Sequence, residues 1–235
     1  YFKINGKLPT HVMAKDLILK IIGDITTEGG AGYAMQFGGS GISEMSVESR
    51  LTLTNMTTEA GAKNGIIEPD QKVFDYLAER GVTEYDAVYD DDDAQYEKTY
   101  EYDLSELEPL VAKPFSPQNI SVVQETTGIE IDKSYIGSCT GAKYEDLEAV
   151  ANILKGRKVK VRTEVVPAAI SIYKKAVENG LDKIFLDAGA VIGAPTCGAC
   201  CGAHMGVLAK DEVCVSTTNR NFPGRMGHVD SKTYL

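Results

Sequence analysis

The sequence predicts an α/β protein of two domains, the second of which is a three-layer α/β/α unit built on parallel strands. The chain has 235 residues, which is enough for two domains of ordinary size. A run of acidic residues and prolines separates its two halves. In the second half, strand-like and helix-like segments alternate along the sequence, which is typical of a parallel sheet covered by helices.

The division between the halves lies in an acidic segment, residues 84–108. It contains eleven acidic side chains and only one basic side chain, Lys98, and it is followed by Pro109, Pro114 and Pro117. Like charges at this density repel one another and stay solvated, and prolines suit connectors. We therefore expect a surface excursion followed by a linker, with domains at residues 1–112 and 113–235.

Hydrophobic periodicity predicts the elements of both halves. In the first half, we expect a strand at Tyr1–Ile4 and helices at Lys15–Ile25, Ser46–Ala62 and Gln71–Arg80. In the second half, we expect strands at Ile131–Ile136 and Val159–Val166, helices around Leu147–Leu154 and at Ala169–Asn179, and a further strand that begins at Ile184–Leu186. The glycines near position 30 lack the spacing of a dinucleotide-binding fingerprint.

The five cysteines all lie in the second half: Cys139, Cys197, Cys200, Cys201 and Cys214. They are too few and too unevenly placed for a disulfide scaffold, and a reducing cytoplasm is the expected compartment. The first follows one predicted strand, and the Cys-x-x-Cys pair follows another. Because the carboxyl ends of parallel strands lie at one edge of a sheet, these two loops can meet. Cys201 and Cys214 are expected to be packed thiols.

The spacing of the cysteines leaves their chemistry open. Cys197, Cys200 and His204, together with Cys139, would supply four ligands to zinc. Three cysteines without a fourth would instead suit an iron–sulfur cluster with one iron open for chemistry. Buried thiols without a metal are a third interpretation.

Polar residues elsewhere suggest a site for carboxylates. Residues 216–225 hold many hydrogen-bond donors, and Arg220 and Arg225 carry guanidinium groups that suit the carboxylates of a di- or tricarboxylate. Asn55 and Glu59 are four residues apart on a predicted helix, so they share one face. A solvated salt-bridge loop and a solvated polar pair are the plainer alternatives.

Charge and hydropathy exclude other classes of function. The net charge of −10 argues against a nucleic-acid partner, because phosphate contacts need clustered cations. No apolar run approaches the roughly 18 residues that a membrane span requires.

A series of short motifs extends over nearly the whole chain: Gly6–Leu8, Ala14–Asp16, Asn55-Met56, Glu59–Ala62, Leu104–Pro109, Gly137-Ser138-Cys139-Thr140, Cys197-x-x-Cys200 and Asn219-Arg220-Asn221-Phe222-x-Gly224-Arg225. Taken in this order, the motifs resemble those of the aconitase superfamily, in particular the large subunits of the isopropylmalate dehydratases, homoaconitate hydratases and dimethylmalate dehydratases. Where family members have Asn after Ser-Cys-Thr, this chain has Gly141.

The resemblance implies a role for each matching residue. Cys139, Cys197 and Cys200 would hold a [4Fe–4S] cluster whose open iron acts as a Lewis acid. Asn219 would support the cluster, and Arg220 and Arg225 would bind substrate carboxylate. Asn55 and Glu59 would be catalytic, with the glutamate hydrogen-bonded to the departing hydroxyl.

The resemblance also implies the reaction and its partner. We expect a hydro-lyase that dehydrates and rehydrates a 2- or 3-hydroxy di- or tricarboxylate, as in leucine biosynthesis. The chain matches the core of the large subunit, without the N-terminal region that carries further active-site residues, and a separate small subunit with a swivelling domain would complete the site. The alternative from another class is a non-catalytic fragment that binds a cluster or zinc for sensing or assembly.

Overall fold

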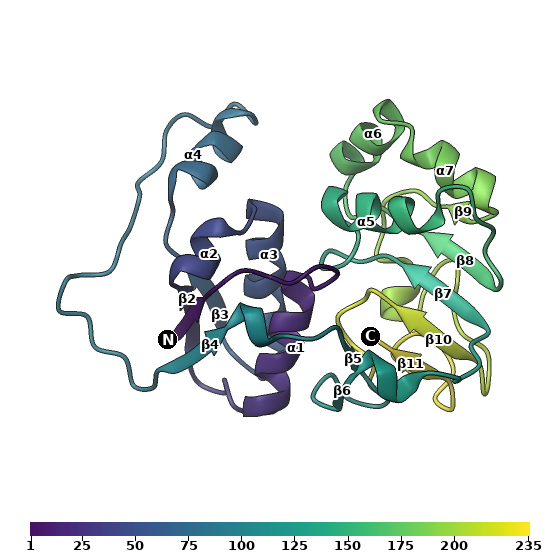
Figure 1. Ribbon diagram of the computed structural model, residues 1–235, viewed down its shortest axis with the longest axis horizontal. Coiled ribbons are helices and arrows are strands. Elements are labelled where there is room, and N and C mark those ends of the chain that lie inside the picture. Colours follow the sequence, from purple (N-terminus) through teal and green to yellow (C-terminus); the bar gives the residue numbers. More distant parts are fainter. The chain divides into compact units, whose positions relative to one another are not determined.

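The computed structural model describes residues 1–235 and divides into two compact units (Figure 1). The first unit comprises residues 1–21 and 25–109, and the second comprises residues 22–24 and 110–235. Each unit is built on a sheet whose strands are all parallel, with helices packed on it. The predicted α/β class is therefore confirmed. None of the helices combines the length and the apolar character that a membrane span requires.

The first unit has a four-stranded sheet in the order β3-β2-β1-β4. The central strand β1 pairs with β2 on one side and with β4 on the other, so the direction of winding reverses between β1 and β4. The strands are β1 (Phe2–Asn5), β2 (Ala34–Gly38), β3 (Asn64–Ile67) and β4 (Tyr100–Asp103).

Apolar faces and polar caps fix the helices of the first unit. In α1, Leu17, Ile18 and Ile21 have no exposed surface, as the helical spacing predicts. The Ser46 side chain caps α3 by accepting a hydrogen bond from the Ser49 amide at 3.0 Å. The helices are α1 (Ala14–Ile25), α2 (Ser40–Glu44), α3 (Val47–Met56) and α4 (Gln71–Ala78), with the 3-10 turns η1 (Thr57–Ala60) and η2 (Leu104–Glu106).

The acidic segment of the first unit is only partly the surface excursion that its charge predicts. No helix or strand lies between α4 and β4, and nearly all of those side chains are exposed. The strand β4 and the turn η2, however, lie inside residues 84–108. The acids that alternate with Tyr100 and Tyr102 in β4 conceal its pattern, because they face solvent while the tyrosines stack against Phe2.

The second unit has a five-stranded sheet in the order β11-β10-β7-β8-β9 and a separate antiparallel pair, β5 and β6. The strands of the large sheet are β7 (Lys133–Ile136), β8 (Arg162–Val165), β9 (Val191–Ile192), β10 (Val213–Ser216) and β11 (Lys232–Tyr234). The antiparallel pair consists of β5 (Leu110–Ala112) and β6 (Ile120–Val122), and the turn η3 (Val123–Thr126) follows it.

Three helices cover one face of the large sheet: α5 (Tyr144–Leu154), α6 (Ile170–Glu178) and α7 (Leu181–Ala188). They gather on the same side of β7, β8 and β9 (Figure 1). The strand predicted to begin at Ile184 is wrong, because residues 184–186 lie in α7. Its buried residues Leu181, Phe185 and Ala188 recur at helical spacing, and the true strand, β9, follows three residues after the helix.

Loops and the 3-10 turn η4 (Gly198–Cys201), rather than α-helices, cover the other face of the large sheet. A buried cluster there joins Tyr135 and Cys214 of the strands to Leu208 and Met226 of the loops. The expected third layer is therefore present without α-helices. The chain crosses from β8 to β9 through α6 and α7, which both pack with α5 on the same face.

Candidate functional site

The three motifs of the second unit begin at one edge of its sheet. Cys139 follows the end of β7, and Asn219 follows the end of the neighbouring strand β10. The Thr217 hydroxyl ties these two ends together. It accepts a hydrogen bond from the Gly137 amide at 2.9 Å and donates one to the Gly137 carbonyl at 3.1 Å. Because parallel strands end at the same edge, this is the edge where ligands gather in open α/β sheets. We call it the motif edge; it comprises the loops that follow β7, β9 and β10 and carry Cys139, the Cys197–Cys200 pair and residues 219–225.

Gly141 is explained by the closeness of these two loops. A Cβ atom at this position would overlap the backbone carbonyl of Thr217. Backbone atoms cannot move aside as the end of a flexible side chain can, so only glycine fits here. The packing of two loops against each other therefore requires the glycine at position 141.

Cys200 is the point where the motifs meet. Its thiol is buried and donates a hydrogen bond to Asn219 Oδ1, with Sγ and Oδ1 3.4 Å apart. Burial raises the pKa of this thiol above its ordinary value, and the charge of Arg225 and its hydrogen bond to the sulfur act in the opposite direction. Cys139 lies close enough for its charge to raise the same pKa. Cys139 from the first loop and Asn219 and Arg225 from the third segment thus act on the Cys200 sulfur.

None of the five cysteines forms a disulfide. Cys139, Cys197 and Cys201 are exposed, whereas Cys214 is buried in β10, where burial raises its pKa to about 12. Cys214 is packed as expected, but Cys201 is not. The structure contains no group of three or more His, Cys, Asp or Glu side chains that could hold a metal ion, and His204 is exposed.

The segment that contains Arg220 and Arg225 is anchored by Asn221, which lies between them. Arg225 is partly buried, and its Nε atom is buried without a hydrogen-bond partner. Arg220 is also partly buried and follows Asn219 directly. Between them, Asn221 is buried and donates hydrogen bonds from Nδ2 to the carbonyls of Ala112, Lys113 and Thr233 at 3.3, 2.9 and 3.2 Å. Asn221 therefore anchors this segment to the antiparallel pair and to β11.

Two further residues support the cysteine loops, and the sequence did not single them out. Tyr135 is fully buried, and its hydroxyl donates to the Cys197 carbonyl at 3.4 Å. Lys143 is buried at the start of α5, and its Nζ donates to the carbonyls of Cys139 and Thr140 at 3.4 and 3.2 Å. Their nearness to the cysteines in sequence was the only signal, and it is a weak one.

Asn55 and Glu59 both lie in the first unit. Asn55 is exposed in the last turn of α3, and Glu59 is buried in η1, where the helix tightens to 3-10 geometry. The single predicted helix over residues 46–62 is thus two consecutive helical elements. The exposed Asn55 and the buried Glu59 therefore do not share the one helix face that their spacing predicted.

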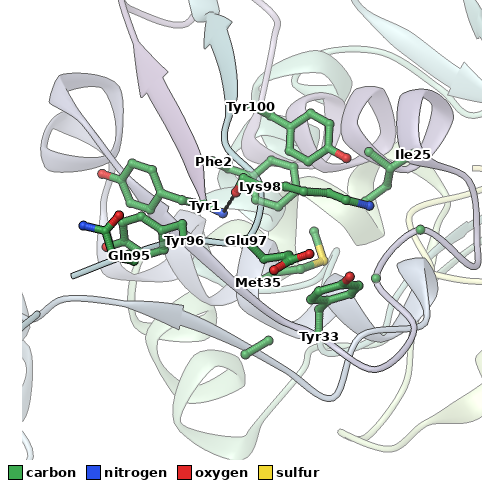
Figure 2. Close-up of a pocket in the computed structure, with 13 residues that line it drawn as sticks. Tyr1, Phe2, Ile25, Tyr33, Met35, Gln95, Tyr96, Glu97, Lys98 and Tyr100 are labelled. Carbon is green, nitrogen blue, oxygen red and sulfur yellow. Dashed lines mark hydrogen bonds between the residues drawn. The ribbon is translucent and has the colours of Figure 1, made fainter.

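A separate hollow of about 210 Å³ lies at the amino ends of β1, β2 and β4 (Figure 2). Its walls are largely aromatic. Tyr1 and Tyr96 stack with their ring centroids 4.5 Å apart, and Lys98 Nζ lies 5.5 Å from the centre of the Tyr33 ring. None of the residues that the sequence predicts for the site lines this hollow, so it is distinct from the motif edge.

Comparison with known proteins identifies the family. The model of the aconitase family (aconitate hydratase) matches residues 1–128 and 121–235. The chain is 49% identical over 236 residues to the 3-isopropylmalate dehydratase large subunit of Halothermothrix orenii. It is 51% identical over 238 residues to the 3-isopropylmalate dehydratase large subunit 1 of Pyrococcus abyssi. Each alignment covers 100% of this chain and 56% of the relative, so the chain spans little more than half the length of these proteins.

A solved structure shares the fold. The crystal structure of Thermococcus kodakaraensis aconitase X in its holo form superimposes with a TM-score of 0.51 at 12% sequence identity. The match covers 97% of this chain and 52% of that one. At this identity the likeness concerns the fold alone, whereas the family model matches the whole sequence. The chain belongs to the aconitase family.

Proposed function

We propose that the chain is the core of the large subunit of a hydro-lyase of the 3-isopropylmalate dehydratase type. The substrate class is a 2- or 3-hydroxy di- or tricarboxylate such as isopropylmalate, which is dehydrated and rehydrated. The observation that carries this proposal is the meeting of Cys200 with Asn219 and Arg225 at the motif edge. The names and the roughly 50% identity of the relatives support the substrate class.

The donor set of this edge fits a [4Fe–4S] cluster held by Cys139, Cys197 and Cys200. None of these thiols is bridged, and thiolates are the soft ligands that iron–sulfur clusters use. Each cysteine of a cluster binds a different iron, so the sulfurs need not converge on one point as the ligands of a zinc ion do. When bound, the cluster supplies a Lewis acid that polarises the leaving hydroxyl.

The side chains of the chain itself would bind and orient the substrate. Arg225 combines a contact with Cys200 and a buried Nε atom that lacks an acceptor, so a substrate carboxylate beside the cluster would complete its hydrogen bonds. Arg220 would bind a second carboxylate oxygen, and Asn219 would hold the Cys200 sulfur in place. Glu59 would hydrogen-bond the departing hydroxyl, and Asn55 would be the second catalytic residue of the first unit.

The proposed partner is a small subunit that carries the swivelling domain. The relatives are named as large subunits, which supports a second subunit of this kind. The unbridged thiols suit the reducing cytoplasm, where the leucine pathway would use this reaction.

Metal and sulfide analysis of anaerobically prepared protein tests the cluster. We expect about four iron and about four sulfide per chain. The variant Cys139→Ser should lose both, and the matched control Cys214→Ser should keep both, because Cys214 lies within the strand β10 and not in one of the loops that carry the three motifs.

Three results would contradict this proposal or narrow it. Stoichiometric zinc without sulfide, or a cluster retained by Cys139→Ser, would contradict the ligand assignment. Turnover is tested by measuring hydration of isopropylmaleate, homoaconitate and dimethylmaleate after a small subunit and the regions that the relatives have outside the matched 56% of their length are added. A cluster without turnover of any of them would favour a non-catalytic cluster-binding role.

A further inference from the structure

The loop-covered face of the second sheet contains a buried ion pair that the proposed function does not use. Lys133 of β7 has no exposed surface, and Glu164 of β8 is only 5% exposed. Lys133 Nζ lies 2.6 Å from Glu164 Oε2. Charges are expensive to bury unless they are paired and hydrogen-bonded, and apolar side chains of similar size would usually fill such a place at no loss of stability.

The groups that face this pair balance its charge. The Tyr135 ring lies beside the ammonium group, with its centre 5.5 Å from Lys133 Nζ. On the other side, Arg162 Nε lies 3.8 Å from Glu164 Oε1, and Arg162 Nη2 lies 3.4 Å from Glu212 Oε2. Alternating charges therefore lead from the core to the surface. The pair carries no net charge of its own, which directs attention to the backbone groups that it contacts.

Lys133 also holds the backbone of the loop after the Cys-x-x-Cys pair. Its Nζ donates a short hydrogen bond to the carbonyl of Gly206. Gly206 has φ +87°, and a Cβ atom there would overlap both the Glu164 carboxylate and the Lys133 ammonium group. The loop backbone thus rests directly on the ion pair, and its left-handed φ favours glycine at this position.

Two residues further on, the same loop is joined to the arginine motif. The Leu208 amide donates to the Met226 carbonyl at 2.9 Å, and the His228 amide donates to the Leu208 carbonyl at 2.9 Å. Met226 directly follows Arg225. The segment from Gly206 to Leu208 is therefore fixed to the sheet at one end and to the arginine motif at the other, and it lies six residues after Cys200.

We propose that Lys133 and Glu164 are positioning residues, which hold the loop of residues 202–208 on the sheet and so keep Cys200 against Arg225. The consequence of this anchoring for the chemistry rests on the proposed function, in which Cys200 is a cluster ligand. An apolar pair would fill the same space but would leave the Gly206 carbonyl without its donor. A neutral pair that still donates to this carbonyl should keep the loop in place.

Two double variants separate the hydrogen bond from the charge. Lys133→Met/Glu164→Met removes both the charges and the donor, whereas Lys133→Gln/Glu164→Gln removes the charges and keeps an amide donor. The readout is the rate at which iodoacetamide alkylates Cys200 in the metal-free chain, followed by mass spectrometry. We expect the methionine pair to raise this rate about tenfold or more, and the glutamine pair to stay within about threefold of the original chain.

Alkylation of Cys139 provides the internal control. Its loop is held by Lys143 instead, so its rate should be the same in both double variants. Circular dichroism and urea unfolding show whether each variant is folded. Gly206→Ala tests the same anchor in a second way. The added methyl group pushes the loop off the ion pair while both charges remain, so alkylation of Cys200 should again be faster.

The proposal is overturned if Cys200 reacts at its original rate in the folded methionine pair, or in folded Gly206→Ala should the methionine pair not fold. Equal acceleration in both double variants would overturn it as well, because the hydrogen bond would then be irrelevant. Iron and sulfide analysis is separate from this assay. A chain that never takes up iron but shows the expected alkylation pattern would refute the proposed function and leave the loop anchor standing.

Discussion

The two faces of the second sheet are built in opposite ways from alternate residues of the same strands. Ile136 and Val165 point to the face under α5, α6 and α7, where the buried cluster consists of apolar side chains. Tyr135 and Val166, their neighbours in sequence, point to the loop-covered face, which also buries Lys133 and Glu164. The period of two in a strand is what allows this separation.

The second unit thus separates the residues that stabilise it from the residues that form its candidate site. The helix face buries apolar surface in regular secondary structure, which stabilises the fold with few special requirements. The loop-covered face uses irregular backbone to bring thiols and polar groups together, and Ser138, Gly198, Gly202 and Gly206 all have positive φ there. We therefore expect mutations on the helix face to change stability alone, and mutations of the groups that hold the loops on the other face to change the site.

The largest effect on stability is expected on the helix face. Phe185 is fully buried in α7, and Phe185→Ala should lower the free energy of unfolding by about 3–5 kcal/mol because it leaves a cavity. Urea unfolding measures this loss, and the folded variant should keep the original rate of Cys200 alkylation. The matched control is Leu186→Ala, next along the chain but 60% exposed, which should cost less than about 0.5 kcal/mol. Faster alkylation of Cys200 in folded Phe185→Ala would show that the helix face also affects the site, which contradicts this expectation.

A smaller effect is expected from two glycines with similar backbone and different surroundings. Gly206→Ala should cost about 2–4 kcal/mol, because left-handed backbone strain adds to the overlap with the ion pair. Gly156 has φ +73° and nothing within 4 Å of the added atom, so Gly156→Ala should cost only about 1 kcal/mol. Urea unfolding of both variants gives the difference. Equal losses would mean that the loop moves off the ion pair at no cost.

The smallest effect is expected from the hydroxyl under the Cys-x-x-Cys loop. Tyr135→Phe removes the hydrogen bond to the Cys197 carbonyl and should cost about 1 kcal/mol at neutral pH. Burial raises the pKa of Tyr135 from 10.0 to about 12, so the folded state holds this proton more tightly than the unfolded state. That stability is present below pH 10 and is lost as the pH rises toward 12. The phenylalanine variant should therefore lose less stability between pH 10 and 12. Parallel plots of the free energy of unfolding against pH for the two proteins would contradict the raised pKa of Tyr135.

Sequence patterns predicted most of the helices and those strands whose buried residues are clearly apolar. The helices at Ala14–Ile25 and Gln71–Ala78 follow from their spacing, and so does β7 before Cys139. β2 and β3 escaped prediction because they are short and contain glycine, and β4 because acids fill its exposed face. Residues 184–186 were assigned to a strand because three apolar side chains in a row fit either element, and only the packing of Phe185 decides between them.

The sequence by itself determined the family and the order of the motifs, because cysteine, asparagine and arginine at these spacings carry their chemistry in the side chains. It also placed Cys139 just after a strand, at the edge where a parallel sheet collects its loops. Only the tertiary structure decided which groups meet: the contact of Cys200 with Asn219 and Arg225, the glycine that Thr217 requires at position 141, and the ion pair beneath Gly206. These contacts join residues distant in sequence, and no local pattern encodes them, since each depends on the strand register and on how closely two backbones approach.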